Sequence, residues 1–98
     1  MACKLEIRPL AAMEIPEAYD WYELQSEGLG AEFLDELTVF YNSILHHPTA
    51  YSFYEKTLRQ GKLTRFPYLV VFEIFDESVV VYSVFMTKQD AGRKRIGL

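Results

Sequence analysis

Hydrophobic residues recur at helical spacing in two neighbouring segments, residues 13–27 and residues 31–46. Their members fall three or four positions apart, so each segment predicts a helix with one apolar face. Proline fits the first turn of a helix, so Pro16 predicts that the first helix begins near Met13. Residues 28–30 form a short connection, which predicts an antiparallel helical hairpin.

Runs of β-branched and aromatic residues predict two strands, at residues 68–75 and residues 79–86. Only residues 76–78 separate the runs, and so short a loop predicts an antiparallel hairpin. Both runs are apolar almost throughout, so we expect central strands that the helices cover well.

Three further segments are less regular. Residues 3–8 alternate loosely before Pro9 and predict a short strand. Residues 48–56 predict an aromatic loop. Residues 57–66 predict a strand or hairpin with a turn or bulge at residues 60–61.

The resulting order, β-α-α-β-β-β, predicts an α+β fold in which a helical hairpin packs as one layer on a small antiparallel sheet. The length of the chain agrees with such a small fold, because 98 residues suffice for one hydrophobic core and not for two. We therefore expect a single domain spanning residues 1–98. The composition, 50% hydrophobic and 24% charged, is that of a globular protein and excludes intrinsic disorder.

The sequence argues against membrane insertion, secretion and a cysteine-based framework. No apolar run is long enough to cross a bilayer, so we expect no membrane-spanning helix. Glu6 interrupts the N-terminal apolar stretch, so we expect no signal peptide. The single cysteine, Cys3, excludes an internal disulfide framework and a multi-cysteine zinc site. These observations predict a cytoplasmic protein with no membrane partner.

Charge is divided unevenly along the chain, whose net charge is −4. Residues 1–55 contain two basic and ten acidic residues, whereas residues 56–98 contain eight basic and four acidic residues. The negative net charge argues against nonspecific nucleic-acid binding. The local distribution of charge on the surface, however, determines which partners a protein attracts. Two interpretations stay open: a basic surface for a nucleic acid, or acidic helices and a basic sheet edge that are simply solvated.

Motifs of the common nucleotide, metalloprotease and hydrolase sites are missing from the sequence, so we expect no cofactor and no metal. A catalytic thiol needs a histidine partner and an activating field, and we expect Cys3, beside the terminus, to be inert. Adjacent helical side chains point about 100° apart, so His46 and His47 cannot share one metal ion. We expect them to stabilise the C-terminal end of their helix.

Glu73 is the acidic residue that lies inside a strongly apolar strand. The two-residue period places it on the same face as Leu69, Val71 and Phe75. It is either a buried carboxylate with a raised pKa, suited to act as a base, or the partner of a nearby arginine such as Arg65. We favour the ion pair.

The candidate catalytic or target-binding residues are Arg59, Lys62, Arg65, Lys88 and Arg93. Such side chains hold phosphate groups and stabilise charge that develops during RNA cleavage. Arg59 and Arg65 share a face only if one strand runs unbroken through Gly61.

Three tyrosines, Tyr51, Tyr54 and Tyr68, are candidates to stack on nucleic-acid bases, with Tyr51 and Tyr68 the leading pair. The alternative is that these rings anchor the core and the loops, and we favour that alternative.

Five segments form an ordered set: EAYDWYE (17–23), GLGAEFLDEL (28–37), the IxxxPxxY pattern at Ile44, Pro48 and Tyr51, RFPYLVVFEI (65–74) and VVVYSVFM (79–86). As a set, and with the β-α-α-β-β-β order, they resemble the RelE/ParE superfamily, the toxins of bacterial type II toxin–antitoxin and plasmid stabilisation systems. Each segment is weak evidence alone, but the ordered set covers nearly the whole chain.

The resemblance implies a small twisted antiparallel sheet with a helical hairpin on one side, and a cognate antitoxin that wraps the toxin. Some members cleave messenger RNA in the ribosomal A site with basic residues and often a C-terminal tyrosine or histidine. Others, on the ParE side, poison DNA gyrase. Arg65 matches the arginine before the Phe-Pro-Tyr start of the central strand, and Arg93 lies where members carry a basic residue. The apolar helix stripe also predicts that the free chain self-associates as a homo-oligomer.

The sequence departs from the nuclease pattern after its last strand. Met86 and Thr87 stand where many relatives carry a histidine, and no tyrosine follows Tyr82. General acid–base cleavage therefore lacks its usual groups, although arginine and lysine alone can position a substrate and stabilise charge. Three functions stay open: a toxin that binds its target, as gyrase-directed members do; a ribosome-dependent mRNA endoribonuclease; and a degenerate member that keeps only antitoxin binding.

Overall fold

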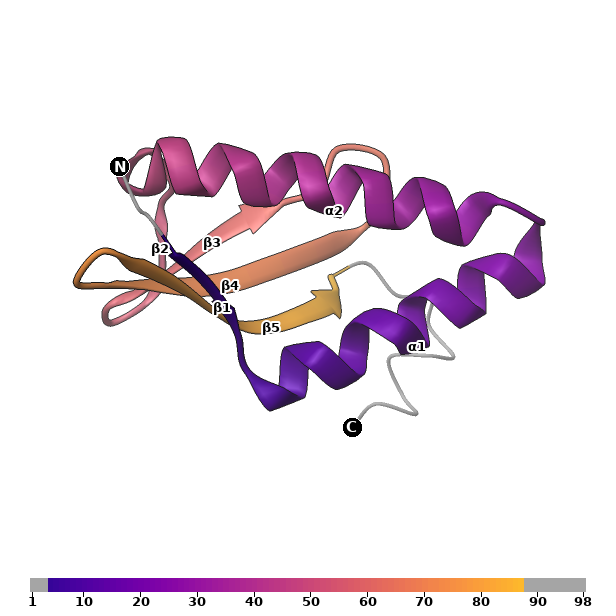
Figure 1. Cartoon of the computed structure of the whole chain (residues 1–98), viewed down its shortest axis with the longest axis horizontal. Helices are drawn as coiled ribbons and strands as arrows, with labels where there is room; N and C mark the ends of the chain where they lie inside the picture. Colours follow the sequence, from indigo (N-terminus) through magenta and orange to yellow (C-terminus); the bar gives the residue numbers. More distant parts are fainter. Residues whose placement is uncertain (1–3, 88–98) are drawn as a thin grey trace.

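The computed structural model describes residues 4–87, which form a helical layer on a five-stranded sheet (Figure 1). Helices α1 (Pro9–Gln25) and α2 (Leu29–His46) form a hairpin, and no helix in this part of the chain is long and apolar enough to cross a membrane. The strands are β1 (Lys4–Ile7), β2 (Phe53–Glu55), β3 (Leu58–Lys62), β4 (Tyr68–Phe75) and β5 (Ser78–Met86), with a short 3-10 helix, η1 (Pro48–Ala50), before β2. The predicted α+β class and helical hairpin are confirmed.

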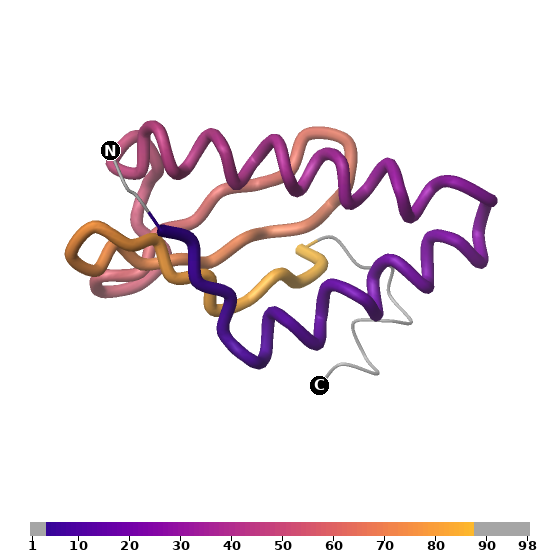
Figure 2. The backbone as a smooth tube through the Cα atoms, viewed as in Figure 1, coloured from indigo at the N-terminus to yellow at the C-terminus, as the bar shows by residue number. Residues whose placement is uncertain are grey.

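The strands lie in the order β1-β5-β4-β3-β2, so the first strand of the chain lies beside the last (Figure 2). Strands β2 to β5 are antiparallel neighbours, and the predicted antiparallel hairpin of β4 and β5 is confirmed. Strand β1 instead runs parallel to β5, with Lys4 opposite Ser78 and Ile7 opposite Val81. The prediction of a wholly antiparallel sheet is therefore wrong for β1. A parallel neighbour needs a long crossover, and the two helices and three strands between β1 and β5 provide it.

Helix α1 begins at Pro9, one turn earlier than the predicted start at Met13, and Pro16 lies inside it. Proline at the first helical position costs no hydrogen bond, because a backbone N–H at that position would have no partner within the helix. Pro16 gives up one backbone hydrogen bond in the helix interior. The buried residues Ala11 and Ala18, on either side of Pro16, hold this helix against the core.

Strand β3 runs straight through Gly61, where a turn or bulge was predicted. A Cβ at Gly61 would lie 2.5 Å from the Cε1 atom of Phe40 and 3.1 Å from the Cδ1 atom of Tyr51. The glycine therefore serves a close approach of α2 to the sheet. Strand β2 lies within the segment predicted as a loop, because three residues are too few to show an alternating pattern.

The core lies between the helices and the sheet, and its largest fully buried side chains include Phe33, Ile44 and Phe72. Aromatic rings pack edge to face at one end, where the Phe33 and Tyr68 centroids are 5.0 Å apart. Burial of each large apolar side chain stabilises the fold by about 1.5–3 kcal/mol. The helices pack on one face of the sheet, as the predicted two-layer fold requires, and β4 and β5 lie inside the sheet as expected (Figure 1).

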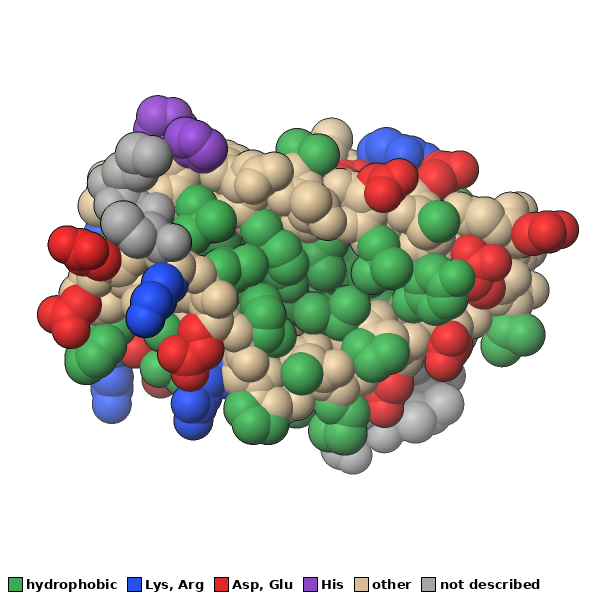
Figure 3. All heavy atoms as spheres, in the orientation of Figure 1, with side chains coloured by type: hydrophobic (Ala, Val, Ile, Leu, Met, Phe, Trp, Pro, Cys, Tyr) green, Lys and Arg blue, Asp and Glu red, His purple; other side chains and the backbone are tan. Residues whose placement is uncertain are grey.

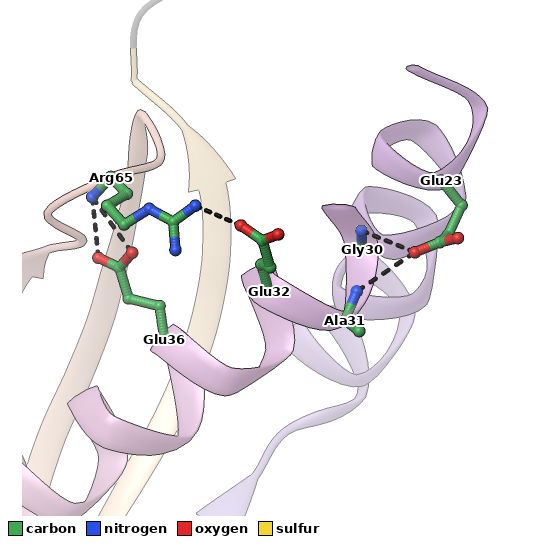
Figure 4. Close-up of polar contacts among 6 residues, drawn as sticks. All are labelled: Glu23, Gly30, Ala31, Glu32, Glu36 and Arg65. Carbon is green, nitrogen blue, oxygen red and sulfur yellow. Dashed lines mark hydrogen bonds and ion pairs between the residues drawn. The ribbon is translucent and has the colours of Figure 1, made fainter. Parts of the chain in front are cut away.

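Glu23 of α1 fixes the turn between the helices. Its carboxylate accepts backbone hydrogen bonds from Gly28 at 3.1 Å, Gly30 at 2.8 Å and Ala31 at 3.3 Å, two of which are drawn in Figure 4. Gly28, the N-cap residue of α2, has no side chain to satisfy these N–H groups. Glu23 therefore caps α2 from the neighbouring helix.

Glu14 joins α1 to the second half of β5. Its carboxylate accepts the backbone N–H of Val84 at 2.7 Å and the hydroxyl of Ser83 at 2.9 Å. Strand β1 pairs with β5 only as far as Val81, and the register between β4 and β5 shifts just beyond that point. Glu14 thus supplies the acceptor that a longer β1 would otherwise provide.

Candidate functional site

The second face of the sheet, opposite the helices, carries a hollow of about 460 Å³. Strand alternation turns Val70 and Phe72 toward the core and Val71 toward this face, which we call the open face. The hollow is lined by Arg8, Pro9, Leu10, Tyr54, Leu58, Val71, Tyr82, Ser83 and Phe85. A sheet face turned to water usually carries polar residues, so an apolar hollow here marks a candidate binding surface.

Glu73 lies on the open face with two hydroxyl partners. Thr57 Oγ1 donates to one carboxylate oxygen at 2.6 Å, and the Tyr82 hydroxyl donates to the other at 2.9 Å. The Thr57 hydrogen bond, followed by that of Tyr82, lowers the pKa of Glu73 below its usual value. The hydrogen bond to Glu73 raises the pKa of Tyr82. Both groups are therefore held in their ordinary states at neutral pH, Glu73 as an anion and Tyr82 protonated.

Both sequence interpretations of Glu73 are wrong. The carboxylate is not a buried base with a raised pKa, and its partners are Thr57 and Tyr82 rather than Arg65. The reason lies in the placement of the helices, which leave the Glu73 face of β4 uncovered.

Strand alternation places Lys62 on the open-face side of β3, and the residue also lines a separate hollow with Glu36 and Phe40 of α2. It follows Leu58 by four positions on β3, so the two side chains share a face. The residue is exposed, and within residues 4–87 its ammonium group has no hydrogen-bond or ion-pair partner. Lys62 is therefore available to an anionic ligand.

Arg59 is engaged within the protein. Its guanidinium donates to the backbone carbonyl of Tyr51 at 2.6 Å and lies 4.1 Å from the ring centroid of Phe53. These contacts tie β3 to the segment between η1 and β2. Arg59 points toward this anchor and is half-buried, so the structure gives it an evident structural role.

Arg65 lies in the loop after β3, against α2. Its guanidinium pairs with Glu32, and its backbone N–H donates to the Glu36 carboxylate at 3.0 Å and 3.2 Å (Figure 4). The backbone N–H of Thr64 donates to the same carboxylate. The hydrogen bond to Glu32 raises the pKa of Arg65 further, so it stays charged. Arg59 and Arg65 therefore face different partners, because β3 ends at Lys62 before reaching Arg65.

The leading tyrosine candidates are packing residues. Tyr68 is 7% exposed and packs in the aromatic part of the core. Tyr51 packs its ring against Phe40 and Phe72, and its hydroxyl lies 2.5 Å from Ser43 Oγ. The expectation that Tyr68 stacks on bases is therefore contradicted, and the core-anchor alternative holds for both rings. Tyr54, which lines the hollow, is 45% exposed and keeps a ring surface free for a ligand.

Three predicted residues, Cys3, Lys88 and Arg93, lie outside the described residues. His46 Nδ1 donates a hydrogen bond to the Asn42 carbonyl at 2.8 Å, in the last turn of α2. Residues 4–87 contain no group of three or more histidine, cysteine, aspartate or glutamate side chains placed to hold a metal ion.

Two residues of the open face, Arg8 and Tyr82, were not predicted as site candidates. Strand alternation from Val80 could have placed Tyr82 on this face, but Arg8 follows β1, whose parallel place beside β5 is a tertiary feature. Together the apolar floor, the phenol groups and the rim cations suit a partner with a flat or apolar group and an adjacent negative charge.

No model of a protein family matches this chain, and no curated protein matches it. Solved structures do match. A chain of the chromosomal ParDE toxin–antitoxin system from P. aeruginosa superposes with a TM-score of 0.77 at 12% identity, covering 87% of this chain and 96% of that one.

Two E. coli structures are similar as well. A chain of the intact RelBE toxin–antitoxin complex has a TM-score of 0.68 at 22% identity, covering 90% of this chain and 100% of its own. The isolated RelE toxin has a TM-score of 0.68 at 20% identity, covering 98% and 96%. This chain therefore has the RelE/ParE toxin fold, as its sequence resemblance implies.

Proposed function

We propose that this chain is the toxin of a type II toxin–antitoxin system, active in the cytoplasm and neutralised by a cognate antitoxin. The observation that carries this proposal is the extent of the fold likeness. It covers 87–98% of this chain and 96–100% of the matched chains, so it is the whole toxin fold that agrees and not a shared motif.

Growth of a bacterial host under inducible expression tests the toxin assignment. We expect induction to arrest growth, and co-expression of the adjacent small open reading frame, if it encodes the antitoxin, to restore it. Normal growth with the folded protein at full level would contradict toxicity and leave the degenerate, antitoxin-binding form. A Gly61→Val variant, whose side chain would collide with Phe40, is the unfolded control.

For the mode of action, we propose that the toxin binds a protein target, as gyrase-directed ParE members do. Arg59 and Arg65 already bind protein groups, and the Glu73–Tyr82 pair is not poised to exchange protons at neutral pH. The open face offers an apolar hollow instead of a cluster of cations. Each of these features supports binding over acid–base cleavage of RNA.

A ribosome-dependent mRNA endoribonuclease is the second candidate. One observation favours it: Tyr54 and Tyr82 line the open-face hollow together with the cation Arg8, and exposed aromatics on a sheet with nearby cations are a common platform for single-stranded RNA.

Two assays separate these modes. Messenger RNA 5′ ends are mapped in a translating extract with and without the purified protein, and supercoiling by DNA gyrase is measured in parallel. We expect intact messenger and inhibited supercoiling. Cuts in step with the A-site reading frame would instead establish the nuclease. In that case both Lys62→Ala and Arg8→Ala should reduce the amount of messenger RNA that is cut.

A further inference from the structure

Strand β1 forms one edge of the sheet, and half of its backbone groups point outward. Lys4 donates its backbone N–H to the Glu77 carbonyl, and Arg8 donates to the Val81 carbonyl at 2.9 Å. In a parallel ladder, alternate residues face the neighbouring strand, so even-numbered residues face β5. The N–H and C=O groups of Leu5 and Ile7 therefore point away from the sheet, where a further strand can bind them.

The side chains of β1 limit which strand can be added. Lys4 and Glu6 are exposed on one face, whereas Leu5 and Ile7 pack against the core on the other. Charged side chains on an edge oppose the approach of most strands. A strand whose charges alternate in the complementary order is the exception, because each charge then meets its opposite.

The same segment of a second copy meets this requirement. In an antiparallel arrangement centred on Leu5, Lys4 lies opposite Glu6 of the second copy, and Glu6 lies opposite its Lys4. The Leu5 residues then form a hydrogen-bonded pair through their outward N–H and C=O groups. Glu6 also pairs with Arg8 at 3.2 Å within its own chain, but both side chains are about half exposed, so this pair opposes the new contact weakly.

A hydrophobic surface lies next to this edge. Figure 3 shows hydrophobic side chains gathered between α1 and α2, and β1 crosses the same face at the border of this area. The partly buried residues that these elements contribute around the core include Leu5, Ile7, Ile15, Leu34, Tyr41 and Leu45. A second copy at the β1 edge would cover part of this apolar surface as well.

We propose that the chain forms a two-fold dimer by antiparallel pairing of β1 with β1 of a second copy, with Lys4 and Glu6 opposite one another across the axis. The symmetry follows from the interface, since a self-complementary strand gives an isologous contact that closes at two chains. The two sheets then join into one continuous sheet. This assembly does not depend on toxicity or on the identity of the target.

Charge exchange at the edge tests the dimer. Sedimentation equilibrium of the full chain gives the dissociation constant of the wild type, Lys4→Glu, Glu6→Lys and the double variant. Each single change places like charges opposite each other twice, so we expect the dissociation constant to rise roughly tenfold or more. The double variant restores opposite charges and should dimerise as the wild type does.

Mixing the two single variants gives the sharpest result. One chain then carries two acids and the other two lysines, so we expect a heterodimer from chains that do not pair with themselves. Glu17→Lys, an exposed charge reversal on α1, is the matched control and should leave the dimer intact. Circular dichroism checks that every variant is folded. A monomeric wild type, single variants that dimerise normally, or a mixture that stays monomeric would each overturn the proposal.

Discussion

The Glu36 carboxylate on α2 accepts the backbone N–H of Arg65 at 3.0 Å, and this bond fixes the loop between β3 and β4 through its main chain. The side chain of Arg65 is held separately, by Glu32. Backbone position and guanidinium position are therefore controlled by two different acids, one helical turn apart. That separation allows the role of the Arg65 side chain to be tested without disturbing the loop.

Arg65→Ala should leave stability almost unchanged, because the Glu36 contacts are to backbone atoms and the lost ion pair is exposed. Glu36→Ala should lower the free energy of unfolding by about 1 kcal/mol, since two backbone N–H groups lose their acceptor. Urea unfolding of both variants measures the difference. Asp35→Ala, the exposed neighbour, is the control; an Arg65→Ala loss as large as that of Glu36→Ala would contradict this division.

Gly61→Ala should lower the free energy of unfolding by about 2–3 kcal/mol, because the new methyl group would collide with the Phe40 ring. Gly28→Ala should cost only about 1 kcal/mol. At Gly28 the backbone φ is 88°, which strains any other residue, but no atom lies within 4 Å of the position that the methyl group would take. Thermal and urea unfolding measure the stability of both variants. Equal losses in the free energy of unfolding would contradict the prediction, because they would show that β3 tolerates a side chain beneath α2.

Tyr41→Phe should leave the free energy of unfolding unchanged or raise it by up to about 1 kcal/mol. The Tyr41 hydroxyl is buried, and no partner for it lies within residues 4–87, so its removal relieves a desolvated polar atom. Burial also raises its pKa to about 12, and the variant should lose the phenol that ionises in that range in an ultraviolet titration. Tyr51→Phe is the control, because it breaks a hydrogen bond to Ser43 and should destabilise the fold by about 1 kcal/mol.

Glu73 should make stability depend on pH in the acidic range. Its pKa is lower in the folded chain than in the unfolded chain, where it is about 4.3. The ionised carboxylate thus stabilises the fold above that value, and the contribution disappears as pH falls through the folded pKa. Glu73→Gln should therefore be less stable than the wild type at pH 7, and the difference should shrink as the pH falls through the folded pKa.

Urea midpoints from about pH 7 to pH 3 measure this dependence. Thr57→Val removes the hydrogen bond that lowers the Glu73 pKa most and should reduce the difference without abolishing it. Glu55→Gln, an exposed acid on β2, provides the control. A Glu73→Gln variant that differs equally from the wild type at both ends of the range would contradict the assignment.

Local patterns were sufficient to predict α2, β4 and β5, because each repeats its period over a long segment. The direction of β1 was not predictable, since four residues carry no information about which neighbour they pair with. Strand β2 was missed for the same reason. The early start of α1 at Pro9 shows that a proline inside a helix is tolerated when burial of Ala11 and Ala18 compensates for the lost hydrogen bond.

The candidate site was harder to predict than the fold. Charge and spacing identified Arg59, Lys62 and Arg65 as candidates. In the structure, however, the backbone carbonyl of Tyr51 binds Arg59, and the carboxylate of Glu32, 33 residues earlier in the chain, binds Arg65. Such partners are set by tertiary structure and leave no trace in local sequence. The open face itself depends on which side of the sheet the helices occupy, and strands that are apolar on both sides do not encode that choice.

The parallel contact between β1 and β5 also determines the order in which the chain can complete its fold. Lys4 is synthesised long before its neighbour, Ser78, so β1 must wait for the helices and three other strands to be made. Until then the helical hairpin forms from local contacts, while β1 has no strand to pair with. The sheet therefore closes late in synthesis, and a ligand that recognises the assembled β1 edge can bind only after β5 has left the ribosome.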